Sequence, residues 1–74
     1  MEEKLLEIIN EMISSKGIET LKKIQREYSF RDDLGFDSFD LAELTVRVED
    51  VFGIDIFEDG LVNTLGEVED KIRK

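Results

Sequence analysis

The 74-residue chain is long enough for one domain with a modest core, and its 19 acidic and 10 basic side chains give a net charge of −9. Cysteine and histidine are both absent, which excludes disulfides, thiolate metal sites and histidine-based catalysis. The negative charge argues against nucleic acid or anionic membrane surfaces as partners and favours proteins with basic patches.

The first segment, from Glu3 to Ser14, is predicted to be a helix because its apolar residues form one wide stripe. Gly17 is suited to a left-handed cap, and Lys16 complements the negative end of this helix. No apolar run is long enough to span a membrane, and the acidic N-terminus is unlike a signal peptide, so we expect a cytoplasmic protein. The stripe consists of Leu5, Leu6, Ile8, Ile9, Met12 and Ile13.

Residues 18 to 36 have no sustained period and are predicted to form a long, ordered and mildly basic loop. Loops of this length are uncommon unless they are functional or well anchored, so we expect apolar side chains to pin this one across the core. The expected anchors are Ile18, Leu21, Ile24, Phe30 and Leu34.

A polar turn containing Gly35 precedes a second helix, which is predicted to run from Asp37 or Ser38 to Phe52 and to end at Gly53. Its buried stripe is expected to contain Leu41, Leu44, Val48 and Phe52. Ser38 then lies at the rim of the core, beside free N–H groups that favour an anion such as a phosphate.

The remaining chain is predicted to form a connection over residues 54 to 57, one short helical turn over residues 58 to 62, and a last helix from Leu65 to Arg73. Thr64 and Glu67 have the spacing of a capping box at the start of that helix. The expected fold is therefore all-α, a small four-helix bundle of three main helices and one short helix.

The stretch Asp-Leu-Gly-Phe-Asp-Ser-Phe-Asp at residues 33 to 40, with Phe-Gly-Ile-Asp-Ile at residues 52 to 56, resembles the acyl carrier protein family. The resemblance spans residues 1–74 as a single domain and implies the bundle fold. It also implies that Ser38, flanked by Asp37, carries a 4′-phosphopantetheine group donated by coenzyme A. The chain departs from the family pattern at Phe39, where leucine is usual, in having no proline, and in a shortened stretch between Ile56 and Leu65.

The implied function is that of a non-catalytic, monomeric carrier, which presents acyl thioesters to enzymes of fatty acid, polyketide or related biosynthesis. The implied partners are a phosphopantetheinyl transferase and acyl-transferring or acyl-activating enzymes with basic docking patches. Two alternatives stay open: a carrier of aminoacyl or peptidyl groups such as D-alanine, and an acidic helical interaction domain in which Ser38 only caps a helix. Serine hydrolase chemistry is not expected, because no histidine can take the proton from Ser38 and the Gly-x-Ser-x-Gly pattern is absent.

The sequence also bears on three further sites. A partner-docking face is expected on the exposed side of the second helix, where acids would steer a basic enzyme and apolar residues would supply contact area. An acyl pocket is expected between this helix and the short turn, and the shortened stretch favours short or polar cargo. No metal site is expected, because Phe57 and Gly66 occupy ligand positions in the only calcium-loop-like segment. The docking residues are Phe39, Asp40, Glu43, Val46, Arg47 and Asp50; the pocket residues are Leu41, Ala42, Leu44, Leu61 and Val62.

Overall fold

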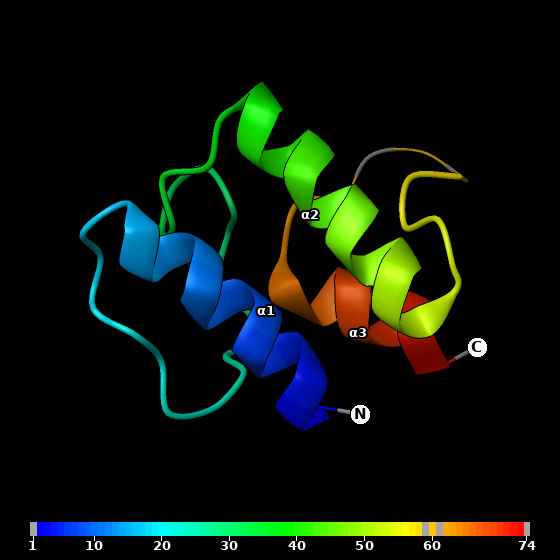
Figure 1. Ribbon diagram of the computed structural model, residues 1–74, viewed down its shortest axis with the longest axis horizontal. Coiled ribbons are helices and arrows are strands. Elements are labelled where there is room, and N and C mark those ends of the chain that lie inside the picture. The colour runs from blue at the N-terminus through cyan, green and yellow to red at the C-terminus, as the bar shows by residue number, and fades with distance from the viewer. Residues whose placement is uncertain (1, 59, 61, 74) are drawn as a thin grey trace.

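The computed structural model describes residues 2–58, 60 and 62–73 and contains three helices, α1 (Glu2–Ser15), α2 (Ser38–Phe52) and α3 (Leu65–Arg73) (Figure 1). Within these residues there is no strand, only an isolated antiparallel bridge between Ser29 and Thr64. None of the three helices has both the length and the apolar character that a membrane-spanning segment requires. The predicted all-α fold is confirmed.

The helix ends follow the local signals in the sequence. Gly17 after α1 and Gly53 after α2 both adopt left-handed conformations, with φ of 82° and 72°. At the start of α3, the Glu67 amide donates to Thr64 Oγ1 at 3.2 Å, and the Thr64 amide donates to Glu67 Oε1 at 3.0 Å. Both glycine caps and the capping box are thus confirmed.

The core lies where one face of each helix meets the long loop. α1 and α2 pack directly against each other, and α3, which lies below α2 and to the right of α1 in Figure 1, contributes to the same core. Burial of these apolar side chains is the main favourable term for a bundle of this size. The buried residues are Leu5, Ile8, Ile9, Met12 and Ile13 from α1, Leu44 and Val48 from α2, Leu65 and Val68 from α3, and Phe30, Leu34, Phe36, Ile56 and Val62 from the connections.

The loop between α1 and α2 is ordered by side-chain anchors, as predicted. Phe30 and Leu34 are buried, and Ile18, Leu21 and Ile24 pack at the edge of the core. The Asn10 side chain also bonds both backbone groups of Leu21, at 2.9 and 2.8 Å. These contacts hold the long connection between α1 and α2 in a defined position.

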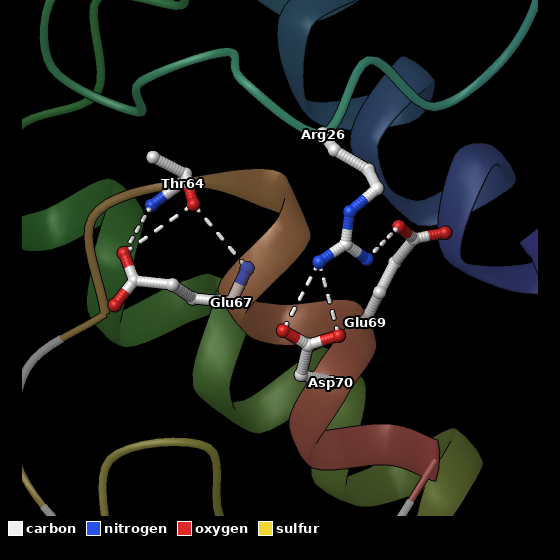
Figure 2. A network of polar contacts seen from close by, with 5 residues as sticks. All are labelled: Arg26, Thr64, Glu67, Glu69 and Asp70. Carbon is white, nitrogen blue, oxygen red and sulfur yellow. Dashed lines mark hydrogen bonds and ion pairs between the residues drawn. The ribbon is translucent and has the colours of Figure 1, made fainter.

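A second set of contacts ties this loop to α3. The amides of Phe30, Leu65 and Gly66 donate to the carbonyls of Asn63, Tyr28 and Arg26 respectively, at 2.9 to 3.1 Å. Figure 2 shows the Arg26 side chain between two carboxylates of α3, with Nη1 at 2.9 Å from Glu69 and Nη2 at 3.0 Å from Asp70.

Glu69 is the only buried charged side chain among the described residues, with 3% of its surface exposed. A buried carboxylate is costly unless it is paired, so the ion pair with Arg26 satisfies a charge that would otherwise destabilise the fold. The loop and α3 are therefore held together by backbone bonds and by this pair.

Gly66→Ala is expected to destabilise the protein by about 2 kcal/mol, through overpacking against the loop. A Cβ atom at Gly66 would lie 2.9 Å from the Arg26 carbonyl oxygen and 3.1 Å from its Cβ, so the backbone of the loop would have to move. The measurement is urea unfolding, with Glu49→Ala on the exposed face of α2 as the control. Equal unfolding free energies for Gly66→Ala and the wild type would show that the loop yields without cost.

The short helix predicted over residues 58 to 62 is not observed. Hydrogen-bonded turns replace it, with the Glu58 amide 3.3 Å from the Asp55 carbonyl and the Gly60 amide 3.1 Å from the Phe57 carbonyl. The Asp55 side chain accepts from the Phe57 amide at 2.9 Å, which favours a turn over a continuing helix. Asp59 and Leu61 lie outside the described residues, so the structure has three helices in the part of the chain that it describes.

Candidate functional site at the start of α2

The start of α2 is fixed by a reciprocal capping box between two aspartates. The Asp40 amide donates to Asp37 Oδ1 at 2.9 Å, and the Asp37 amide donates to Asp40 Oδ2 at 3.0 Å. Asp37 is therefore the N-cap, and Ser38 is the exposed first residue of the helix. The amides of Ser38 and Phe39 have no acceptor among the described residues, so this helix end presents donors beside the Ser38 hydroxyl.

The turn before the helix is held from below by the core. Gly35 has a φ of 66°, a conformation that costs glycine little, and the next amide, of Phe36, donates to the Phe30 carbonyl at 2.7 Å. The buried rings of Phe30 and Phe36 stack with centroids 5.5 Å apart. Ser38 thus follows a short turn that is anchored at its apolar side chains.

Asp40 also links α2 to the end of α1. Lys16 Nζ lies 2.7 Å from Asp40 Oδ2, and the two side chains are partly shielded from solvent. The hydrogen bond from Lys16, followed by the one from the Asp37 amide, lowers the pKa of the Asp40 carboxyl. The same contact raises the pKa of Lys16. The sequence indicated only that Lys16 would complement its own helix.

This pair predicts a pH dependence of stability. Because the pKa of Asp40 is lowered by folding, its contribution is present above the ordinary aspartate pKa and is lost as the pH falls through the pKa of the folded state. The difference in unfolding free energy between the wild type and Lys16→Gln should therefore be largest near neutral pH and vanish in acid. Urea unfolding over a pH series measures it, with Lys23→Gln as a control for loss of one positive charge. A difference that persists unchanged in acid would contradict this role of Asp40.

A surface hollow of about 240 Å³ adjoins Ser38. A second hollow of about 210 Å³ shares Arg31 and Leu41 with it and extends to Val62. The first is lined by Arg31, Ser38, Leu41, Ala42, Thr45 and Phe57. Because they share these two residues, the hollows adjoin on the surface between Ser38 and the segment before α3, and we call them together the furrow.

Three of the five predicted pocket residues line this furrow, namely Leu41, Ala42 and Val62. Leu44 is fully buried in the core, and Leu61 lies outside the described residues. Arg31, Thr45 and Phe57 were not predicted as pocket residues. Of these, only Arg31 had a signal in the sequence, as part of the mildly basic loop.

The predicted docking face is exposed at both of its apolar residues. Phe39 is 86% exposed and Val46 is 61% exposed, and single large apolar side chains this open to solvent are available for contact with another protein. Phe39 directly follows Ser38, and both side chains are exposed at the start of α2.

The charged docking residues are partly engaged within the protein. Arg47 Nε lies 2.8 Å from Glu43, and Arg47 Nη1 lies 3.2 Å from Glu11, so this arginine joins α2 to α1. Asp50 borders a hollow of about 200 Å³ between the same two helices. Asp40 holds the helix start as described above, and its docking role stays a prediction.

The chemistry of this site is that of an exposed hydroxyl on a rigid support. The chain has no histidine to activate Ser38, and the Asp37 carboxylate is held by the Asp40 amide. A reaction at Ser38 therefore depends on a base supplied by another protein.

Comparison with protein families supplies a match over most of the chain. A family model described as a phosphopantetheine attachment site matches residues 3–72, which is nearly the whole chain. No solved structure matches the chain.

Proposed function

We propose, because the chain belongs to the phosphopantetheine attachment site family, that it is an acyl carrier protein with Ser38 as the attachment residue. Domains of this family bear 4′-phosphopantetheine and are carriers without catalytic activity. When attached, the group supplies a terminal thiol on which cargo is held as a thioester. The finer assignment concerns the residue, the acyl cargo and the pathway, which we take to be fatty acid, polyketide or related biosynthesis.

The observation that carries the assignment of Ser38 is its place at the start of α2. It is an exposed serine at the first position of a helix, between two aspartates whose side chains are held in a capping box. The anionic diester formed at its hydroxyl would lie next to the amides of Ser38 and Phe39, which have no acceptor among the described residues, and a helix terminus favours negative charge there. The residues present therefore fit the phosphate end of the group.

The chain's own contribution to catalysis by its partners is to hold the cargo at a fixed site. Tethering replaces diffusion of free cargo by a high effective concentration at each enzyme that docks. The exposed side of α2, with Phe39 and Val46 among acidic residues, is the proposed docking face for a phosphopantetheinyl transferase and for acyl-transferring or acyl-activating enzymes.

The direct test is to incubate the purified chain with coenzyme A and a broad-specificity phosphopantetheinyl transferase. Intact mass should show one added group, and peptide mapping should place it on Ser38. An unchanged mass would favour the alternative of an acidic helical interaction domain, in which Ser38 is only the first residue of a helix.

The cargo class is the second part of the proposal. The furrow beside Ser38 is open and of modest volume, which favours short or polar cargo over a long acyl chain. An aminoacyl or peptidyl group, for example D-alanine, is the alternative cargo that such a furrow also admits. Charging the loaded protein with an acyl-activating enzyme and, separately, with a D-alanine-activating enzyme would distinguish the two.

We expect a short acyl chain to contact the furrow between α2 and the segment before α3. In forms loaded with short and long acyl chains, the amide resonances of Ala42 and Val62 should shift relative to the uncharged form. With the short chain, the shifts of these two amides should be more similar to each other than with the long chain. Two-dimensional NMR of the amides measures this, with Glu27 on the other loop as an internal control. If neither acyl chain perturbs these amides, the cargo stays in solvent and the prediction of an acyl pocket in the furrow is wrong.

A further inference from the structure

Arg31 lies beside Ser38 although it belongs to a different element. It is in the loop before α2, and its side chain lines the hollow of about 240 Å³ that contains Ser38. It also lines the adjoining hollow of about 210 Å³. Of the charged side chains in the described part of the chain, only Arg31 borders the hollow that contains the serine.

The charge of Arg31 has no partner in the part of the chain that the structure describes. Arg26 pairs with Glu69 and Asp70, Arg47 pairs with Glu11 and Glu43, and Lys16 pairs with Asp40. Within the described residues Arg31 is exposed and forms neither an ion pair nor a hydrogen bond through its side chain. An unpaired guanidinium is therefore available at this place.

The surroundings of Ser38 need such a cation once an anion is attached. Asp37 and Asp40 flank the serine, and the chain as a whole carries a net charge of −9. The positive charge of Lys16 is already matched by Asp40. A phosphodiester on the Ser38 hydroxyl would add negative charge to an acidic helix start, and a guanidinium can bind two of its oxygens at once.

We propose that Arg31 binds the phosphodiester that joins the prosthetic group to Ser38 and so directs the arm along the furrow toward Val62. The inference rests on the proposed attachment at Ser38. It assigns Arg31 a positioning role in the loaded protein, in which the loop before α2 and the helix start hold the phosphate from two sides.

The experiment compares the loaded wild type with loaded Arg31→Gln, Arg31→Lys and the control Lys23→Gln. Lys23 is exposed in the same loop and does not line either hollow of the furrow. Its replacement by glutamine therefore removes one positive charge without changing the furrow. The first readout is the phosphorus NMR resonance of the attached group. The second is the Nε–Hε resonance of Arg31 before and after loading, with those of Arg26 and Arg47 as internal references.

We expect loading to shift the Arg31 Nε–Hε resonance while those of Arg26 and Arg47 stay in place. The phosphorus resonance should move in Arg31→Gln, return partway in Arg31→Lys, and stay at the wild-type position in Lys23→Gln. The difference between wild type and Arg31→Gln should shrink with added salt, because the contact is exposed to solvent. Because Arg31 is a surface residue, unfolding midpoints of the four proteins should agree.

Three results overturn the inference, and the measurements distinguish them from one another. If the wild type gains no mass with coenzyme A and the transferase, the attachment at Ser38 fails and this role of Arg31 fails with it. The second result is a loaded wild type whose phosphorus resonance is the same in Arg31→Gln and whose Arg31 Nε–Hε resonance does not shift on loading. In that case the carrier assignment stands and the phosphate contact is wrong. Slow loading of Arg31→Gln with an unchanged phosphorus resonance also overturns the contact and assigns Arg31 to recognition by the transferase.

Discussion

Ser38→Ala is expected to abolish attachment of the prosthetic group while leaving the fold intact. The Ser38 side chain is exposed, and the helix is capped by Asp37, so no capping bond is lost. Replacing an exposed side chain that makes no capping bond usually changes stability by no more than about 0.5 kcal/mol. Intact mass after incubation with coenzyme A and a transferase measures loading, and urea unfolding measures stability.

The matched control for this variant is Ser14→Ala, which removes another exposed serine hydroxyl, near the end of α1. It should be loaded like the wild type. A Ser38→Ala protein that still gained the mass of the group would place the attachment on another side chain and would end the assignment of Ser38.

Reversing the charge of Glu43 is expected to slow loading by the transferase far more than it changes stability. Glu43 lies on the docking face about 8 Å along α2 from Ser38, which is within reach of a basic enzyme bound at the serine. Electrostatic steering of this kind changes association rates by on the order of tenfold. The Glu43–Arg47 pair is exposed, so its loss should cost no more than about 0.5 kcal/mol. The measurement is the initial rate of loading at low salt.

The control is Glu27→Lys, which makes the same change of charge on the long loop, away from α2. Its loading rate should fall much less than that of Glu43→Lys. The gap between the two variants should close as ionic strength rises, because salt screens steering between exposed charges. If Glu43→Lys and Glu27→Lys were loaded at equal rates at low salt, the slower loading would result from the change in net charge and not from the docking face of α2.

Local sequence signals accounted for the helices and their ends. The apolar period placed the three main helices, and the structure begins or ends each of them within a residue or two of the prediction. Gly17, Gly53 and the pair Thr64 and Glu67 were recognised as caps because capping acts through neighbours within one turn. The sequence left open whether α2 begins at Asp37 or Ser38; in the structure the helix begins at Ser38, and Asp37 is its cap.

The predicted short helix over residues 58 to 62 is not observed, and the reason is again local: the sequence signal for it was weak. Residues 58 to 62 offered no apolar period of sufficient length, and a single helical turn forms few hydrogen bonds for the residues that it orders. The Asp55 side chain binds the Phe57 amide instead, and a chain of turns results among the described residues.

The sequence by itself determined the all-helical class, the ends of the main helices and the serine at the start of α2, because apolar period and capping depend on residues one turn apart. Only the tertiary structure decided which charges meet across the chain. Lys16 and Asp40 are 24 residues apart, and Arg26 and Glu69 are 43 apart, so their pairing depends on how the long loop packs over the core. The same packing brings Arg31 to the hollow beside Ser38. The sequence could not predict this contact, because no spacing rule relates a side chain in a loop to the start of a helix.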